Sequence, residues 1–210
     1  SATYRRVPGE SAAVAIAEAP PTVGINRACR AGRSPADIAP YVDEYDAAIH
    51  HGDRAIGRLL ESLARRGRTD DTVVVVTSDH GEEFLEHGAC FHIRSLYREI
   101  VHVPLVYSVP GLEPRRVSSL VPASVSVAPT ILDVVGVAKR LREGPSLAPF
   151  LDGRKTPDFD YVVSETAIRY RGRRYGHVRS LTGEREKLIR WTLEQRHEYF
   201  DLTSDPRESR

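Results

Sequence analysis

The sequence of 210 residues has no methionine, a single tryptophan and only two cysteines. Because Cys29 and Cys90 form no spaced framework, the sequence supports neither a disulfide scaffold nor a cysteine-ligated zinc site. No apolar run approaches the length of a membrane span, and the first residues do not resemble a signal peptide. Since the chain begins at Ser1 and contains no methionine, we expect its natural start to lie upstream.

A strong excess of charge is also lacking. The chain carries 30 basic and 29 acidic residues, which leaves a formal net charge of +1. A chain this close to neutral is not expected to bind nucleic acid or another polyanion through bulk charge. Its length allows one large domain or a substantial piece of a larger protein.

The most informative stretch is a run of four valines followed by the sequence Thr-Ser-Asp-His-Gly-Glu. The β-branched run predicts a strand over Val73–Thr77 that is buried on both faces. Ligands bind outside the carboxyl ends of strands in open α/β sheets, so chemistry is expected where this strand ends. Asp79 offers a carboxylate oxygen and His80 a neutral imidazole nitrogen, which makes them adjacent candidate ligands for a divalent metal. Gly81 would let the backbone turn sharply beside a bound ion.

Simpler explanations exist for the same residues. An Asp-His pair at a strand end also serves as a helix cap or as a hydrogen-bond partner within a loop. Glu82 and Glu83 are interpreted as helix-start acids and surface charge rather than as ligands. His87 and His92 follow closely in the sequence, and together with the strand and the glycine they give a metal site equal weight with these simpler explanations.

Apolar spacing and turn residues predict the elements around this strand. We expect helices at 41–67, 96–101 and 128–137, strands at 103–107 and 117–121, and a loop at 144–153. Short β segments between residues 161 and 200 predict a small antiparallel sheet. The predicted fold class is α/β, a mixed sheet flanked by helices. We expect an irregular N-terminal segment at 1–40, an α/β domain at 41–155 and a small C-terminal β subdomain at 156–210.

Six blocks of sequence, in a fixed order, resemble the C-terminal half of a sulfatase of the alkaline-phosphatase superfamily. They are the helix at 45–60, the Thr77–Gly88 motif, the segment 96–105 with Leu-Tyr-x-Glu and Val-Pro-Leu, Ala128–Gly136, Gly144–Gly153 and Tyr199–Glu208. The resemblance covers Tyr41 to the C-terminus. It implies a partial alkaline-phosphatase-like sandwich and an arylsulfatase-like, metal-dependent hydrolase of sulfuric esters.

The resemblance implies a metal site at the end of the valine strand. Asp79 and His80 resemble the second pair of metal ligands in the family, which usually binds calcium. An imidazole ligand is equally suited to manganese or zinc, so the ion stays open. The ion would orient the nucleophile and offset charge on the sulfate oxygens.

The resemblance also implies roles for two histidines. His92 resembles the position of a Lys or His that contacts the sulfate or the leaving-group oxygen, where an imidazolium can donate a proton. The alternative for His92 is a loop histidine packed against Phe91. His87 is expected either to fix Glu82 or His80 or to contact the substrate.

The departures from the family pattern are informative. The half with the paired aspartates and the Cys-x-Pro-x-Arg motif, from which the family makes its formylglycine nucleophile, has no counterpart here. The stretch Cys29–Arg33 imitates that motif, but it lies directly before the helix expected from Tyr41, so we do not assign the nucleophile to Cys29. Ser126 stands where the family usually carries Asp.

Three hypotheses follow. The chain is the C-terminal part of a sulfatase that is inactive alone, a non-catalytic sulfatase-like remnant, or part of a phosphoesterase or phosphonate monoester hydrolase of the same superfamily. The expected partner is a sulfate or phosphate ester of a small molecule or sugar. The basic stretch Tyr170–Arg174 is interpreted as solvated loop charge rather than as a substrate contact.

Overall fold

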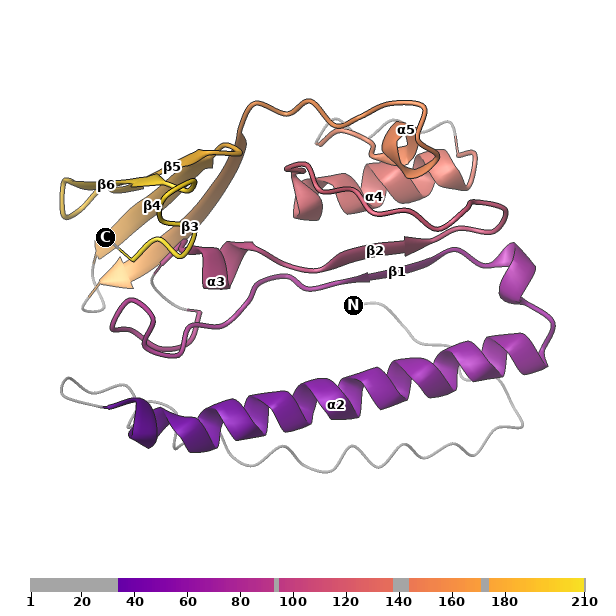
Figure 1. Ribbon diagram of the computed structural model, residues 1–210, viewed down its shortest axis with the longest axis horizontal. Helices are drawn as coiled ribbons and strands as arrows, with labels where there is room; N and C mark the ends of the chain where they lie inside the picture. Colours follow the sequence, from indigo (N-terminus) through magenta and orange to yellow (C-terminus); the bar gives the residue numbers. More distant parts are fainter. Residues whose placement is uncertain (1–33, 93–94, 138–143, 171–173, 210) are drawn as a thin grey trace.

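The computed structural model describes residues 34–92, 95–137, 144–170 and 174–209. The elements are α2 (Pro35–Arg65), the 3-10 helix η2 (Thr69–Asp71), β1 (Val74–Thr77), α3 (Arg98–Val101), β2 (Leu105–Ser108), α4 (Ala123–Val134), α5 (Ala148–Leu151), β3 (Val162–Tyr170), β4 (Arg174–Thr182), β5 (Glu186–Trp191) and β6 (Arg196–Asp201). The β1–β2 ribbon runs between α2 on one side and α4 with α5 on the other, while β3–β6 and the C-terminus lie at one end (Figure 1).

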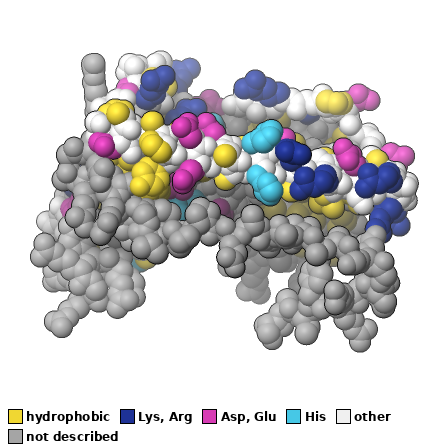
Figure 2. Space-filling view, turned by 90° about the horizontal axis from the view of Figure 1, so that it is seen from below, with side chains coloured by type: hydrophobic (Ala, Val, Ile, Leu, Met, Phe, Trp, Pro, Cys, Tyr) yellow, Lys and Arg dark blue, Asp and Glu magenta, His cyan; other side chains and the backbone are white. Residues whose placement is uncertain are grey.

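Helix α2 begins at Pro35 rather than at Tyr41, so the prediction that residues up to 40 are irregular is wrong for this part. Pro35 occupies the start of the helix, where a missing N–H is tolerated, and the Asp37 carboxylate accepts from the backbone N–H of Ser34 at 2.8 Å. Asp37 lies in the first turn of this helix and Arg65 in its last turn, which suits the helix dipole. Figure 2 shows both acidic and basic side chains along the face of the molecule that carries this helix.

The apolar side chains of α2 are less buried than their helical spacing suggests. Ile38 is the buried residue of this helix, whereas Ile49 and Leu59 are more than half exposed. None of the described helices combines the length and the apolar character needed to cross a bilayer.

Strand β1 confirms the strand predicted from the valine run, but not its burial. It pairs antiparallel with β2, so that Val74 lies opposite Ser108 and Thr77 opposite Leu105. Val74 to Val76 are half-buried. Within the described residues β2 is the only strand bonded to β1, and the second edge therefore lacks the neighbour that would complete the burial.

The C-terminal strands form the predicted antiparallel sheet, in the order β3-β4-β5-β6. Alternate residues of β5 point inward, and they are Lys187, Ile189 and Trp191. The core cluster combines this inner face with the segment before α3, and its buried members are Leu96, Tyr97, Val178, Ile189, Trp191 and Phe200. The main core thus lies where the C-terminal sheet meets the segment that follows the histidine-rich loop. The division into domains at residue 155 stays a prediction.

Three further boundaries differ from the sequence predictions. Residues 117–121 form no strand, and Val117 is exposed. Helix α4 begins at Ala123 rather than at residue 128, so Pro129 lies in its interior. The loop predicted at 144–153 contains α5, whose start is stabilised by a hydrogen bond from the N–H of Ala148 to Ser146 Oγ at 3.2 Å.

Candidate functional site

Asp79 and His80 lie in the irregular loop that follows β1. Asp79 Oδ1 accepts from the backbone N–H of His80 at 3.0 Å, and Ser78 Oγ donates to the His80 carbonyl at 2.6 Å. Side-chain bonds of this kind hold a loop without helix or strand pairing. The Asp79 side chain is 88% exposed, and its Oδ2 lies 3.7 Å from His80 Nε2. A carboxylate oxygen and an imidazole nitrogen therefore lie near each other at the surface.

The ring of His80 is oriented by the backbone of the next residue. His80 Nδ1 lies 2.9 Å from the Gly81 carbonyl, which can only accept, so this nitrogen carries the proton and donates. The lone pair of the neutral ring is then on Nε2. The ring stacks on that of His92, with centroids 4.0 Å apart. The sequence did not predict this His80–His92 stack.

Glu82 completes a cluster with these two histidines. His92 Nδ1 lies 3.2 and 3.1 Å from the two carboxylate oxygens of Glu82. One ligand atom each from His80, Glu82 and His92 lie within 4.8 Å of one another. No helix begins at Glu82, and its side chain is largely buried, so its interpretation as a helix-start acid and surface charge is wrong. No periodic signal links residues 82 and 92, and only the course of the loop brings them together.

The side chain of Glu83 is fully buried, so the prediction that it is a surface charge is wrong as well. Its carboxylate accepts from the backbone N–H groups of His87 at 3.2 Å and Ala89 at 3.1 Å, and from Ser95 Oγ at 3.1 Å. A buried carboxylate needs such donors to offset its lost hydration. Glu83 therefore ties the two ends of the loop segment together.

Gly81 is required for a different reason from the sharp turn expected of it. A Cβ at this position would lie 1.9 Å from the backbone oxygen of Glu99. The N–H of Gly81 donates to the Ile100 carbonyl at 2.8 Å, which holds the loop directly against α3. The absence of a side chain permits this close approach.

We therefore expect Gly81→Ala to lower the free energy of unfolding by about 1–3 kcal/mol, because α3 and the loop must separate to admit the methyl group. Urea denaturation monitored by circular dichroism measures the change. The matched control is Gly52→Ala in α2, where a Cβ meets nothing within 4 Å. Gly52→Ala should stabilise by up to about 1 kcal/mol, and equal effects of the two substitutions would contradict the packing argument.

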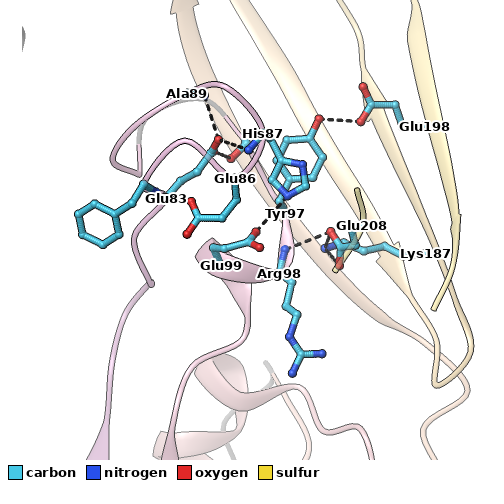
Figure 3. Close-up of polar contacts among 12 residues, drawn as sticks. Glu83, Glu86, His87, Ala89, Tyr97, Arg98, Glu99, Lys187, Glu198 and Glu208 are labelled. Atoms are coloured by element: carbon cyan, nitrogen blue, oxygen red, sulfur yellow. Dashed lines mark hydrogen bonds and ion pairs between the residues drawn. The ribbon is translucent and has the colours of Figure 1, made fainter. Parts of the chain in front are cut away.

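The ring of His87 lies against Tyr97 and Glu99, and not against Glu82 or His80, which it was expected to fix. Its ring stacks on Tyr97 with centroids 3.6 Å apart, and its Nε2 lies 3.2 Å from Glu99 Oε2 (Figure 3). The His87 side chain is 8% exposed. The contact with Glu99 lacks the alignment of a hydrogen bond, so it is a close polar contact within the packed region.

Tyr97 connects this loop to the C-terminal sheet. Its hydroxyl donates to Glu198 Oε2 of β6 at 2.7 Å. Burial, and then this bond to a carboxylate, raise the pKa of Tyr97 well above its ordinary value. A hollow of about 480 Å³ lies beside these residues and is lined by His87, Tyr97, Glu198 and Glu208 among others. The His80–Glu82–His92 cluster does not line it.

Some residues singled out from the sequence do not join the site. Ser126 is fully buried within α4. Cys29 and the stretch Arg171–Arg173 lie outside the described residues.

Two sulfatase family profiles and several known sulfatases match this chain. The family profile described as Sulfatase matches residues 6–137, and the profile described as N-sulphoglucosamine sulphohydrolase, C-terminal, matches residues 85–210. A curated relative, the N-acetylglucosamine-6-O-sulfatase of Bacteroides thetaiotaomicron, is 33% identical over an alignment of 182 residues that covers 80% of this chain and 31% of that protein.

Solved structures of related enzymes share the fold of this chain. A 2-O GAG sulfatase is similar with a TM-score of 0.70 and 28% identity, covering 80% of this chain and 38% of that one. A phosphonate monoester hydrolase from Silicibacter pomeroyi is similar with a TM-score of 0.61 and 29% identity, covering 73% and 33%. The chain thus spans about a third of the length of the proteins that it matches.

Proposed function

Because this chain belongs to the sulfatase family and has its alkaline-phosphatase-like fold, we propose that it supplies one wall of the active site of a metal-dependent sulfuric ester hydrolase. The observation that carries the proposal is the cluster after β1, where Asp79, His80 and His92 lie in one loop. The proposed substrate is a sulfate ester of a sugar, as the names of the similar sulfatases suggest.

Asp79 and His80 are proposed to hold the divalent ion of this wall. The fit is supported by the exposed Asp79 carboxylate and by the His80 Nε2 lone pair, since Nδ1 is engaged by Gly81. A bound ion would offset charge on the sulfate oxygens. Two protein ligands do not complete a coordination sphere, so further ligands must come from elsewhere in the assembled enzyme.

His92 is proposed to donate to a sulfate oxygen or to the leaving-group oxygen. Its ring stacks on that of His80, and its Nδ1 faces Glu82, which leaves Nε2 to face a substrate. A donor fixed beside developing negative charge lowers the barrier. His87 is not assigned a substrate contact, because its ring is packed under Tyr97 and beside Glu99.

The nucleophile lies outside this proposal. The 210 residues contain no Cys-x-Pro-x-Arg sequence, and this chain matches only about a third of its relatives' length. We therefore propose that the isolated chain does not turn over sulfate esters, because binding and positioning groups cannot replace a missing nucleophile.

A chimera tests the function. The C-terminal third of the Bacteroides N-acetylglucosamine-6-O-sulfatase is replaced by residues 41–210 of this chain and coexpressed with a formylglycine-generating enzyme. We expect the chimera, but not the isolated chain, to hydrolyse 4-nitrophenyl sulfate or a sulfated glucosamine. Within the chimera, His92→Ala should lower kcat on the order of 10²–10³-fold.

The control is the chimera in which the residue that yields the formylglycine, a Cys or Ser in the family, is changed to alanine, and it should be inactive. A folded chimera that hydrolyses neither sulfate nor phosphonate esters would contradict the proposal, as would turnover by the isolated chain. Faster hydrolysis of a phenylphosphonate than of the sulfate would favour the second candidate, a phosphonate monoester hydrolase, which the similarity to the Silicibacter structure supports.

A further inference from the structure

We propose that the outer face of the C-terminal sheet β3–β6 is a dimerisation surface, on which a second copy of this chain packs face to face. The sheet lies at one end of the molecule (Figure 1). Its inner face forms the core cluster together with the segment before α3, so the outer face is the one that can meet a partner. The inference does not rest on the proposed function.

An apolar row crosses this outer face from one edge strand to the other. The strand register sets one apolar residue of each strand directly opposite the next, and the four are Val163, Leu181, Leu188 and Tyr199. Side chains opposite each other across strands lie about 5 Å apart, so the row is continuous. Their exposed fractions range from 38% to 66%. Contiguous apolar side chains left open to water are typical of a surface that contacts another protein.

Charged residues of opposite sign flank the row. On one side, Glu186 of β5 lies opposite Asp201 of β6. On the other side, Arg190 of β5 lies opposite His197 of β6. In each of these strands the flanking residues stand two positions before and two positions after the residue of the row. The outer face is therefore acidic on one side of the row and basic on the other.

Arg190 is available for a contact with a partner. Its side chain is exposed, and it forms no ion pair with the described residues. By contrast, the neighbouring Arg179 of β4 is bound to Glu165 of β3 at 2.7 Å. Arg190 can therefore pair with a carboxylate from outside the chain without breaking an existing bond.

Glu186 is held in place for such a contact. The hydroxyls of Tyr161 and Tyr199 donate to its two carboxylate oxygens at 2.7 and 3.0 Å. These two hydrogen bonds lower the pKa of Glu186, which keeps the carboxylate ionised. A carboxylate oxygen can accept more than one donor, so an arginine can still bind to this group.

A twofold axis along the apolar row matches both flanks at once. Rotation about this axis turns one sheet over onto the other, sets each strand above its own copy and reverses the strand direction, so each apolar residue meets the same residue of the partner. Arg190 then faces the partner's Glu186. His197 likewise faces the partner's Asp201, and every ionic contact is made twice. An axis parallel to the strands would set basic flank on basic flank, which like-charge repulsion disfavours.

The size of the face is sufficient for a weak dimer. Four strands about 4.8 Å apart and six residues with a rise of about 3.3 Å each give a flat area of about 19 Å by 20 Å. At its lower limit a specific interface takes about 600 Å² of accessible surface from each partner, which the side chains projecting from such a face supply. We therefore expect a dissociation constant in the micromolar range.

Sedimentation velocity of the whole 210-residue chain at rising micromolar concentrations tests the dimer. We expect a reversible equilibrium between monomer and dimer. Leu188→Glu should raise the dissociation constant at least about 100-fold, because it buries a charge within the apolar row. Arg190→Glu and Glu186→Lys should each raise it at least about 10-fold, because like charges then meet twice. The matched control is Val106→Glu at an exposed valine of β2, which should leave the dissociation constant unchanged.

Mixing two variants tests the twofold register. When Arg190→Glu chains are mixed with Glu186→Lys chains, each contact across the axis again joins opposite charges, so a heterodimer should form with nearly the affinity of the unchanged chain. A mixture that stays monomeric overturns the proposed pairing, as does a dimer that Leu188→Glu leaves intact. A chain that is monomeric at every concentration also overturns it, since the row then contacts another part of a longer protein or a different partner. Circular dichroism checks that each variant folds, and the mixing experiment stands even if Leu188→Glu does not fold.

Discussion

Lys187→Ala is expected to lower the free energy of unfolding by about 3–5 kcal/mol, because it leaves a buried carboxylate without its cation. Lys187 of β5 is 1% exposed, and its ammonium donates to both oxygens of Glu208 at 2.9 and 2.8 Å. Burial lowers the pKa of Lys187, and the Glu208 carboxylate acts in the opposite direction. Urea denaturation followed by tryptophan fluorescence measures the loss, since Trp191 lies in the same core.

The position of Glu208 explains why one pair should matter so much. Besides Lys187, its carboxylate accepts from the backbone N–H of Arg98 at 3.1 Å, at the start of α3 (Figure 3). The C-terminal segment is thereby joined both to the sheet and to the helix that packs against Gly81. We therefore expect amide exchange at Arg98 to accelerate in Lys187→Ala as well.

The control is the double variant Lys187→Met with Glu208→Gln. Methionine fills the space of the lysine stem, and glutamine keeps an oxygen for the Arg98 N–H. Because replacing both partners of a buried ion pair is often neutral, this variant should recover most of the lost stability. A loss as large as that of Lys187→Ala would show that packing, and not the unpaired charge, is responsible.

Glu83→Ala is expected to lower the free energy of unfolding by about 3 kcal/mol, since three donors lose a buried acceptor and each orphaned group costs about 1–3 kcal/mol before water relaxes the site. The donors are the backbone N–H groups of His87 and Ala89 and the hydroxyl of Ser95. Denaturant unfolding gives the free energy, and nuclear magnetic resonance of the histidine rings reports whether the loop loses its order.

Two variants make this prediction specific. Glu83→Gln keeps the shape but turns an amide donor toward other donors, so its loss should be intermediate. Glu86→Ala removes an exposed carboxylate of the same loop, which accepts from the N–H of Phe84, and should cost less than about 1 kcal/mol. Similar losses for Glu83→Ala and Glu86→Ala would contradict a special role for the buried acid.

Much of the architecture could be predicted from the chain because local patterns report it directly. The valine run predicted β1, and the alternating segments near the C-terminus predicted the sheet β3–β6, because β-branched and alternating residues favour extended chain. The start of α2 could not be predicted from apolar spacing, which begins at Tyr41, whereas Pro35 and the Ser34–Asp37 cap begin the helix earlier.

The burial of these elements could not be predicted in the same way. The valines of β1 are half-buried, and much of the apolar face of α2 is exposed, because burial depends on what packs alongside and not on the residue alone. A pattern of apolar residues predicts which face of a helix or strand can be buried. The neighbouring strands and helices decide whether it is.

For the candidate site, the sequence by itself determined which stretch of chain follows β1 and so predicted its first two candidate ligands. Strand β1 ends at Thr77, and the residues directly after it, Asp79 and His80, place an oxygen and a nitrogen donor at its carboxyl end, because short-range chain connectivity fixes their position. The tertiary structure alone decided the rest. It placed Glu82 against His92, stacked His92 on His80, buried Glu83 and turned His87 toward Tyr97 and Glu99. These contacts join residues without any common period, so only the folded path of the loop, held by α3 and the C-terminal sheet, could bring them together.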